Sequence, residues 1–347
     1  MNPSTSTSTS TSTVRDTLQH YADLTQAAIA ERLDRTGPSP YLYDLVRDYP
    51  ARGGKGIRPA LLLATCQAYG RPVEEALPVA VSLEMMHNAF LIHDDVEDSS
   101  PLRRGRPTLH AVHGVPLAVN AGDALAQAAL APLYEATTLG PRLTRLLLAE
   151  LRMVVTQATE GQALELGWRR DDRSDLTDAD YLEVAGKKTC WYTTMAPLRI
   201  GAQLGRWRPE PAALDRLGFL AGCAFQIRDD LLDLAPGGQT GKTPRSDVVE
   251  GKRTLVLIHL LSVADPAERA WVVDYLNREP DDRSPADQDQ LLTLMSAAGS
   301  LAYAERFAAV LATAAQESLG TAFADVPPSP ALDFLRELID YLVSRTD

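Results

Sequence analysis

Two acidic clusters hold the residues of this chain whose types and spacing could do chemistry. They are the segments DDVED at 94–98 and DDLLD at 229–233, and each follows an apolar stretch with helical spacing. Within each cluster carboxylates recur four residues apart, a spacing that stacks them on one helix face at about 5–6 Å. Because stacked like charges repel each other, the sequence predicts that cations neutralise both clusters.

Hard divalent cations suit that role. A protein usually holds Mg²⁺ through one or two carboxylates, and water and phosphate oxygens complete the octahedron. Two facing sets of carboxylates therefore predict a phosphate-bearing ligand between them.

Basic side chains accompany the acidic clusters. Some follow the Gly53-Gly54 pair, where the backbone can approach a ligand closely. The basic residues in question are Lys55, Arg58, Arg103, Arg104, Lys187, Lys188, Lys242 and Lys252. Any one of them alone is most often a solvated surface charge, but together they favour a binding site for an anion.

The composition of the chain limits its class. Of its 347 residues, 45% are hydrophobic and 6% aromatic, a balance that favours helices around a sizeable core. The formal net charge of −12 argues against binding nucleic acid or an anionic membrane surface. No apolar run reaches the ~18–20 residues of a transmembrane helix, so we expect a soluble, cytoplasmic protein. Cys66, Cys190 and Cys223 follow no metal or disulfide spacing and are expected to be buried free thiols.

Hydrophobic periodicity predicts an all-α protein. Residues 1–13 are dominated by alternating Ser and Thr, and we expect them to form a disordered tail. From 14 to 347 apolar residues recur at helical spacing with no shift in composition, which predicts one large helical bundle as a single domain. The clearest predicted helices span 57–69, 75–98, 117–139, 142–167, 178–204, 212–234, 251–264 and 329–345.

Six segments have a specific order along the chain. They are GGKGIRP (53–59), LEMMHNAFLIHDDVEDSSPLRRGRPTLH (83–110), EGQALEL (160–166), KT (188–189), FQIRDDLLD (225–233) and GKTPRSDVVEGKRTL (241–255). This order resembles that of the trans-isoprenyl diphosphate synthases, the polyprenyl synthetase family, and is most like that of geranylgeranyl diphosphate synthases. The resemblance implies an isoprenoid-synthase type of bundle with a central cavity, working as a homodimer.

The resemblance also implies a role for each matching residue. Asp94, Asp98 and Asp229 match metal ligands, which would hold about three Mg²⁺ ions. Asp95, Asp230 and Asp233 match carboxylates that support them or share the metals. Positions that hold the allylic diphosphate, or lie beside it, match Arg103, Lys188, Thr189, Gln226, Lys242 and Lys252. Positions of the isopentenyl diphosphate pocket match Lys55, Arg58, His87 and Arg104.

The implied reaction is the head-to-tail condensation of isopentenyl diphosphate with an allylic diphosphate. Heterolysis of the allylic C–O bond leaves a diphosphate and a carbocation, so catalysis needs cations around the leaving group and walls that exclude water. In the family the released diphosphate takes up the proton, so no side chain need act as the general base. His93, next to Asp94, is expected to be a partner of the acidic cluster rather than a base.

Product length depends, in the resemblance, on residues that precede Asp94 on its helix. Phe90, Ala89 and Met86 lie four, five and eight residues before it, and one helical turn of ~5.4 Å is close to the span of an isoprene unit. Helix geometry places Phe90 and Met86 nearest the Asp94 face, whereas the role of Ala89 follows from the family alone. The small Ala89 favours the C20 product, geranylgeranyl diphosphate, over the C15 product, farnesyl diphosphate. Ordinary core packing explains the same residues equally well.

Other interpretations fit parts of the pattern. A class I terpene cyclase shares an Asp-rich helical bundle, but its second motif usually has the form NDxxSxxxE. A non-catalytic regulatory subunit typically loses an acidic cluster, and this chain keeps both. Gly56 stands where the family often has Arg, and Trp191-Tyr192 has no assigned role, with cavity wall, dimer contact and packing all open.

Overall fold

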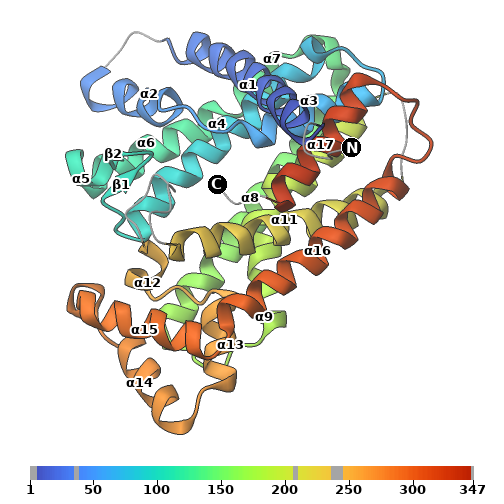
Figure 1. The fold of residues 1–347 in the computed structure, drawn as a ribbon. Coiled ribbons are helices and arrows are strands. Elements are labelled where there is room, and N and C mark those ends of the chain that lie inside the picture. Colours follow the sequence, from blue (N-terminus) through green and yellow to red (C-terminus); the bar gives the residue numbers. More distant parts are fainter. Residues whose placement is uncertain (1–5, 35–38, 206–209, 236–244, 345–347) are drawn as a thin grey trace.

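Helices form almost all of the structure (Figure 1), a computed structural model that describes residues 6–34, 39–205, 210–235 and 245–344. This confirms the predicted all-α class. The first elements are α1 (Ser6–Leu33), α2 (Tyr43–Ala51), α3 (Ile57–Ala68), α4 (Val73–Glu97), β1 (Leu102–Arg103), β2 (Arg106–Pro107), α5 (Leu109–His113), α6 (Val115–Ala128), α7 (Ala131–Glu135) and α8 (Gly140–Arg170). They are followed by α9 (Asp178–Ala185), a π-helix (Gly186–Met195), α10 (Ala196–Leu204), α11 (Pro211–Leu234), α12 (Ser246–Glu250), α13 (Leu255–Val263), α14 (Pro266–Leu276), α15 (Pro285–Ala297), α16 (Ser300–Ala322) and α17 (Pro330–Ser344). Short 3₁₀ turns lie at Ser39–Tyr41, Thr137–Leu139 and Pro280–Asp282.

Most predicted helices match observed ones, and three predictions need correction. The helix predicted over 117–139 is broken into α6 and α7, because Pro132 lacks the amide hydrogen that would continue the ladder. The segment predicted over 178–204 is helical throughout, but its middle is a π-helix. The helix predicted from residue 251 begins only at Leu255, where the Thr254 hydroxyl accepts a hydrogen bond from the Leu257 amide.

The described backbone starts with α1 at Ser6. The disordered tail predicted for residues 1–13, the single domain predicted for 14–347 and the central cavity stay predictions. Within the described ranges, no helix is both long and apolar enough to cross a membrane.

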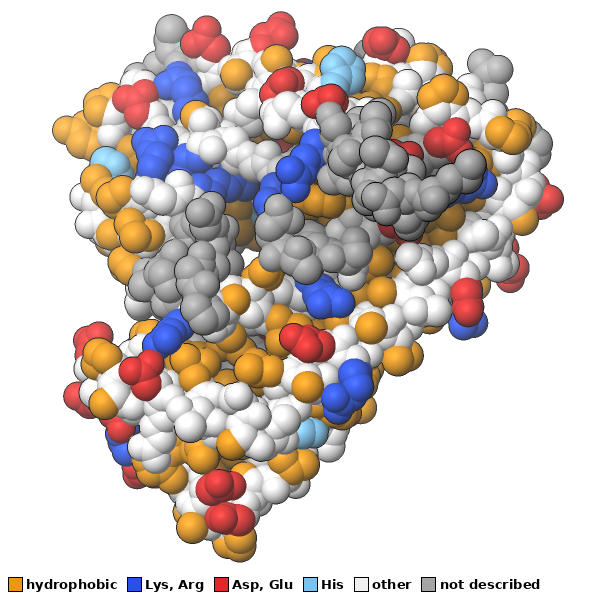
Figure 2. All heavy atoms as spheres, viewed as in Figure 1, with side chains coloured by type: hydrophobic (Ala, Val, Ile, Leu, Met, Phe, Trp, Pro, Cys, Tyr) orange, Lys and Arg blue, Asp and Glu red, His pale blue; other side chains and the backbone are white. Residues whose placement is uncertain are grey.

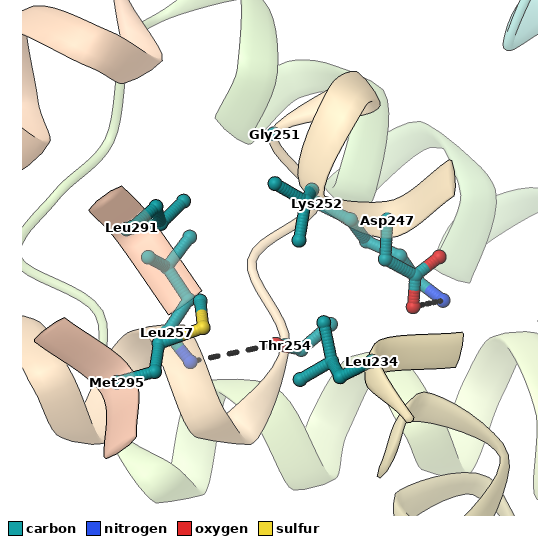
Figure 3. Close-up of a pocket in the computed structure, with 9 residues that line it drawn as sticks. Leu234, Asp247, Gly251, Lys252, Thr254, Leu257, Leu291 and Met295 are labelled. Carbon is teal, nitrogen blue, oxygen red and sulfur yellow. Dashed lines mark hydrogen bonds and ion pairs between the residues drawn. The ribbon is translucent and has the colours of Figure 1, made fainter. Parts of the chain in front are cut away.

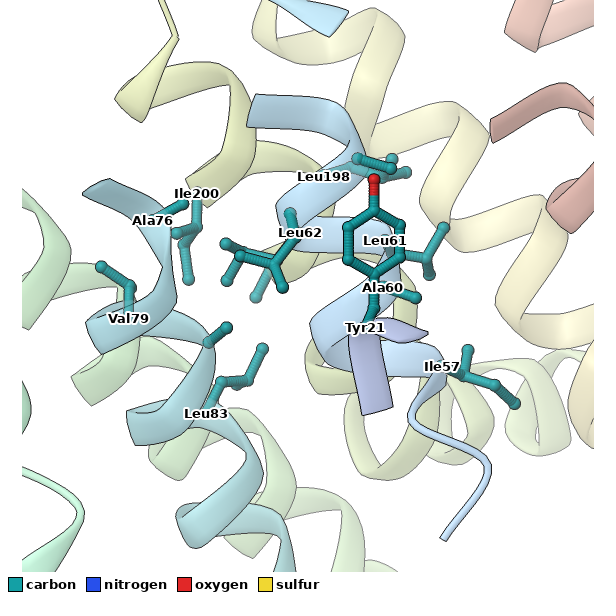
Figure 4. Packing of buried hydrophobic residues seen from close by; sticks show 14 of the residues in the cluster. Tyr21, Ile57, Ala60, Leu61, Leu62, Ala76, Val79, Leu83, Leu198 and Ile200 are labelled. Atoms are coloured by element: carbon teal, nitrogen blue, oxygen red, sulfur yellow. The ribbon is translucent and has the colours of Figure 1, made fainter. Parts of the chain in front are cut away.

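The main hydrophobic core surrounds α3 and α4. Residues 60–66 of α3 are all buried, and on α4 the buried residues lie on every side, as expected for central helices. Figure 4 shows Leu62 of α3 turned toward Val79 and Leu83 of α4, and Leu61 on the other side of α3 near Tyr21. These two helices are thus rigid supports for whatever their ends carry.

A second hydrophobic core lies among α9, α11, α13, α14, α15 and α16, in the lower part of Figure 1. Trp191 and Leu311 pack against both cores. The last turn of α11 and the start of α12 lie between the two cores in this view. Figure 2 shows the surface indented between the upper and lower parts, with Lys and Arg side chains gathered on the upper part near α2.

Two glycines let the π-helix pack tightly between α8 and α11. A Cβ on Gly161 of α8 would lie 2.4 Å from the Lys188 backbone nitrogen, and a Cβ on Gly218 of α11 would lie 2.7 Å from the Met195 Cα. Both distances are far below any van der Waals contact, so only glycine allows these approaches. The close fit brings the side chains of the π-helix to the ends of the neighbouring helices, and π-helices are frequent at functional sites.

Candidate active site

Both acidic clusters lie at the C-terminal end of a long helix. The first covers the last turn of α4 and its C-cap, Asp98, and the second covers the last turn of α11. The C-terminal end of a helix carries partial negative charge, so carboxylates there need cationic partners more than elsewhere.

In the first cluster Asp95 is fully buried and held on both sides. It accepts a hydrogen bond from the Tyr49 hydroxyl of α2 and another from Arg103 Nε at 2.8 Å. Arg103 comes from the β1–β2 hairpin, whose two turn residues, Arg104 and Gly105, both have positive φ, as a two-residue hairpin turn requires. The tight turn thus aims the Arg103 guanidinium back at α4.

The outer carboxylates of the first cluster contact basic side chains. Asp94 lies 3.2 Å from Arg103 Nη2 and 3.2 Å from Lys188 Nζ, and Asp98 pairs with Arg169 of α8. Burial, followed by repulsion from Asp94, raises the pKa of Asp98 to about 6. A cation that bound beside Asp98 would therefore favour its charged form.

Lys188 joins this cluster to Glu165, a residue that the sequence analysis did not single out. The Lys188 Nζ lies 3.1 Å from Glu165 Oε1, and Glu165 is buried on α8. Burial alone would raise the pKa of Glu165, but Lys188 and Lys252 lower it below its ordinary value. Glu165 is thus a buried anion that orients Lys188. Its signal was present in the EGQALEL segment, but the segment does not show which of its carboxylates turns inward.

In the second cluster Asp230 is buried and has three partners. It accepts hydrogen bonds from the Tyr181 hydroxyl at 2.8 Å, from Gln226 Nε2 at 2.7 Å and from Lys252 Nζ at 3.2 Å. Tyr181 was also missed by the sequence analysis, because it lies on α9, 49 residues from its partner. Asp229 is half-buried on the same turn of α11.

Asp233 holds the start of α12. Its carboxylate accepts from the Ser246 hydroxyl at 3.0 Å and from the Asp247 amide at 2.9 Å. Figure 3 shows Asp247 turned toward Lys252, and their ion pair measures 3.5 Å. Asp233 therefore places the loop that supplies Lys252. The predicted site residue Lys242 lies outside the described residues.

A polar path connects the two clusters. Lys188 contacts Asp94, and Thr189, the next residue, donates to Gln226 Oε1 at 2.8 Å. The same Gln226 donates to Asp230. Predicted site residues that are far apart in sequence thus come together from α4, the π-helix and α11.

A second group of predicted residues lies along the other side of α4. Arg58 donates to the Thr193 hydroxyl at 3.0 Å, and His87 is buried with its Nδ1 lacking a hydrogen-bond partner. A Cβ on Gly54 would lie 2.8 Å from Arg104 Nη2, so only glycine leaves the Arg104 guanidinium its place. Lys55 is exposed beside them.

Charge in this group is dominated by guanidinium cations. Burial, followed by Arg58 and Arg104, holds the pKa of His87 well below its ordinary value, so the ring is neutral. Burial raises the pKa of Glu84, although the same two arginines oppose the shift. A pocket of about 110 Å³ lies between Glu84, α1 and the glycines of the Gly53–Gly56 loop. The charged side chains that line this pocket are Asp23 and Glu84, so an anion would bind at the guanidinium groups beside it.

The three predicted chain-length residues have different surroundings. Ala89 and Met86 are buried in the main core, and Phe90 is half-buried with its ring edge-on to Tyr192, 5.7 Å between centroids. Tyr192, to which the sequence analysis assigned no role, thus packs against Phe90.

The structure corrects the expectation for His93 and explains the glycine at position 56. His93 does not contact the acidic carboxylates: its Nε2 lies 3.3 Å from Asp123 and near the Val119 carbonyl, so it packs on α6. Gly56 has φ of +64°, and a Cβ there would lie 2.5 Å from the Ala22 Cβ of α1. In this chain α1 therefore occupies the space that a larger residue at position 56 would need.

The donor set fits divalent cations only together with another ligand. Among the described residues, no three Asp, Glu, His or Cys side chains converge to hold a metal ion by themselves. Asp94 and Asp98 on one side and Asp229 on the other would each supply one or two oxygens. This matches Mg²⁺, which takes few protein carboxylates and completes its shell with water and phosphate oxygens.

Known proteins that are similar to this chain include three prenyl diphosphate synthases. The geranylgeranyl diphosphate synthase of Methanosarcina mazei is 32% identical over 335 residues, 96% of this chain and 98% of that protein. The geranylfarnesyl diphosphate synthase of Natronomonas pharaonis is 31% identical over 350 residues, 96% of this chain and 98% of that protein. The nonaprenyl diphosphate synthase of Mycobacterium tuberculosis is 33% identical over 299 residues, 84% of this chain and 83% of that protein.

Solved structures agree in fold. The geranylgeranyl pyrophosphate synthetase of Pyrococcus horikoshii superposes with a TM-score of 0.85 at 30% identity, covering 96% of this chain and 99% of that one. The geranylgeranyl pyrophosphate synthase of Corynebacterium glutamicum, in complex with isoprenyl diphosphate and magnesium, gives 0.80 at 27% identity, covering 96% and 98%. The family model described as Polyprenyl synthetase matches residues 39–295. This chain belongs to the polyprenyl synthetase family, which comprises transferases of isoprenoid biosynthesis.

Proposed function

We propose that this protein is a Mg²⁺-dependent prenyltransferase that joins isopentenyl diphosphate head-to-tail to an allylic diphosphate. The observation that carries the proposal is the polar path from Asp94 through Lys188, Thr189 and Gln226 to Asp230. It lines up carboxylates from two helices with a lysine between them, an arrangement that suits a diphosphate held together with metal ions.

The side chains divide the work of the reaction. Lys188, Arg103 and Lys252, already fixed by carboxylates, place positive charge where the allylic diphosphate leaves, so little reorganisation is needed when the C–O bond breaks. Mg²⁺ bound by Asp94, Asp98 and Asp229 would neutralise charge that develops on the leaving group. The C1 carbon of the allylic group then forms a bond to C4 of isopentenyl diphosphate, a C2 proton leaves, and the released diphosphate takes it up.

The isopentenyl diphosphate pocket is proposed at Lys55, Arg58, His87 and Arg104. Two guanidinium groups and a neutral imidazole face one another there beside a glycine pair. Arginine forks match diphosphate oxygens, and the neutral ring can donate one hydrogen bond without adding charge.

The product is proposed to be geranylgeranyl diphosphate, the C20 compound, with farnesyl diphosphate, the C15 compound, as the alternative. Relatives of similar identity carry the names of several product lengths, so overall likeness does not choose among them. The choice depends on Phe90, Ala89 and Met86, of which only Phe90 presents a bulky half-buried ring.

We also propose that the protein is a homodimer of the cytoplasm. Val112, Val115 and Val119 of α5 and α6 are 59%, 51% and 38% exposed, and clustered exposed apolar residues often mark an interface. The three cysteines are buried and free, which suits a reducing compartment. Light scattering of the parent and of a Val115→Lys variant tests the dimer, and a monomeric parent would contradict it.

Product analysis tests the reaction. Purified protein is incubated with Mg²⁺, labelled isopentenyl diphosphate, and dimethylallyl, geranyl or farnesyl diphosphate in turn. A linear C20 diphosphate supports the proposal in full, and accumulation at C15 supports only its first part. No condensation from any starter, or condensation that persists after chelation of all divalent metal, overturns it.

A further inference from the structure

Tyr192 makes three ring contacts that join two separate parts of the proposed site. Its ring stacks on the His87 ring, with centroids 5.7 Å apart and planes at 29°. It meets Phe90 edge-on, 5.7 Å between centroids with planes at 69°. The Arg58 guanidinium carbon lies 4.6 Å from its ring centroid.

The π-helix explains why one residue can make all three contacts. Along it, Lys188 contacts Asp94, Thr189 contacts Gln226, and Thr193 accepts a hydrogen bond from Arg58. Tyr192 lies on the same π-helix between Thr189 and Thr193, and π-helices are frequent at functional sites. Tyr192 therefore stands between the groups assigned to the allylic diphosphate and those assigned to isopentenyl diphosphate.

The position of Phe90 places this ring pair on the proposed path of the prenyl chain. Phe90 lies one helical turn before Asp94 on α4, and one turn of about 5.4 Å is close to the length of an isoprene unit. A prenyl chain that runs from the diphosphate site along α4 toward Met86 must pass the paired rings of Phe90 and Tyr192. Edge-to-face pairs are favourable arrangements of aromatic rings, so the pair resists displacement by the chain.

We propose that Tyr192 is a specificity-determining residue, whose ring forms with Phe90 the barrier that stops growth of the prenyl chain. This inference rests on the proposed function and favours its C15 alternative, because a barrier at Phe90 closes the path that the small Ala89 would leave open. The contact between Tyr192 and Arg58 adds a second consequence, because the ring holds the guanidinium in its place in the isopentenyl diphosphate pocket. A residue that only stabilised the core would affect neither the product length nor the KM for isopentenyl diphosphate.

The experiment measures chain length and total condensation separately. Tyr192→Leu, Phe90→Leu, the double variant and the parent are incubated with isopentenyl diphosphate and with dimethylallyl, geranyl or farnesyl diphosphate in turn, and the products are resolved by mass spectrometry. Tyr192→Phe keeps the ring and Tyr41→Leu changes an aromatic residue that is 68% exposed, so both serve as matched controls.

The expected result is a shift of both single Leu variants to products at least one isoprene unit longer than the parent product. The double variant should give the same distribution as the singles, because either change opens the barrier. Tyr192→Leu should also raise KM for isopentenyl diphosphate about two- to fivefold, the size of a lost cation–π contact. Tyr192→Phe and Tyr41→Leu should keep the parent distribution.

Other outcomes count against the inference. If Tyr192→Leu condenses substrates but keeps the parent distribution, Tyr192 does not set chain length. Should that variant fail to fold, Tyr192→Met, which keeps bulk without a ring, replaces it, and an unchanged distribution there has the same meaning. A parent that condenses nothing overturns the proposed function itself, a result that is distinguishable because no product of any length appears.

Discussion

The two acidic clusters have the same spacing and share one structural plan. In each, the second Asp of the Asp-Asp pair is buried and accepts hydrogen bonds from a tyrosine hydroxyl and from a cation. The partners are Tyr49 and Arg103 for Asp95, and Tyr181 and Lys252 for Asp230. The tyrosine comes in each case from a different helix, so the buried Asp also fixes how two elements pack.

The clusters differ in their last residue. Asp98 pairs with the guanidinium group of Arg169. Asp233 instead accepts hydrogen bonds from the Ser246 hydroxyl and the Asp247 backbone amide. A side-chain partner can turn away when a metal ion arrives, but the backbone amide at the start of α12 cannot. Identical DDxxD spacing thus has two structural outcomes: a side chain holds Asp98 in the first cluster, whereas the backbone at the start of α12 holds Asp233 in the second.

The largest expected effect comes from the carboxylates proposed to bind Mg²⁺. Asp94→Asn and Asp229→Asn should each lower kcat by about 10³-fold, the loss expected when charge stabilisation of the leaving group is removed. Asp94→Asn leaves Arg103 paired with Asp95 and Lys188 paired with Glu165, so the thermal stability of this variant should stay close to that of the parent. Steady-state kinetics at saturating Mg²⁺ and thermal unfolding measure the two effects.

A solvent-exposed carboxylate provides the control. Asp171 pairs with Arg170 at the surface, and surface pairs contribute little to stability. Asp171→Asn should therefore leave both rate and stability unchanged. If Asp229→Asn were as active as this control while Asp94→Asn was inactive, the second cluster would not bind metal, and the comparison would need another explanation.

The next largest effect is a loss of stability when a lysine that pairs with either cluster is replaced, and we expect it to differ between Lys252 and Lys188. Lys252→Met leaves Asp230 and Asp247, whose side chains are 3% and 8% exposed, without their cation. Breaking a buried ion pair on one side should lower the free energy of unfolding by about 3 kcal/mol. Lys188→Met strands only one buried carboxylate, that of Glu165, because Asp94 is 20% exposed and also contacts Arg103, so it should cost less.

Denaturant unfolding of both lysine variants checks this order. The double variant Lys252→Met with Asp230→Asn removes the stranded charge and should recover much of the lost stability. Equal losses for the two lysines, or no recovery in the double variant, would show that Asp230 is not held by Lys252 as described.

Much of this arrangement could be predicted from the sequence, for a physical reason. The helices that carry the clusters are long and strongly periodic, so their existence, and the four-residue stacking of the carboxylates, follow from local pattern alone. The basic residues near the clusters were found in the same way. Local pattern could not, however, separate Asp98 from Asp233, because the partners that distinguish them come from elsewhere in the chain.

The missed features all depend on contacts between distant segments. Tyr49 lies 46 residues from Asp95, and Tyr181 lies 49 residues from Asp230. The π-helix has an ordinary helical sequence, and its wider turn accompanies the close packing at Gly161 and Gly218. The role of Tyr192 follows from that turn, which is why its position stayed open until the fold was known.

A smaller effect tests the shared plan of the clusters. Tyr49→Phe and Tyr181→Phe each remove one hydroxyl from a buried carboxylate, and a hydrogen bond to a charged group contributes about 1.5–3 kcal/mol. Both changes should lower the free energy of unfolding by similar amounts within that range. Tyr134→Phe, at a residue 67% exposed, should have no effect in the same denaturant titration. A large loss for one buried tyrosine only would mean that the clusters do not share the plan.

The smallest effect bears on the residue in which the clusters differ. Asp233→Ala removes the acceptor for the Asp247 amide and the Ser246 hydroxyl at the start of α12, and loss of such a cap costs about 1 kcal/mol. If Asp233 is structural, this variant should keep its Mg²⁺ dependence and lose no more than about tenfold in rate, mainly because Lys252 is less well placed. Asp98→Ala, its counterpart in the first cluster, should lose rate and Mg²⁺ affinity together, because that carboxylate has no backbone to hold. Mg²⁺ titrations of activity distinguish the two, and an Asp233→Ala variant that behaves like Asp98→Ala would make the clusters equivalent.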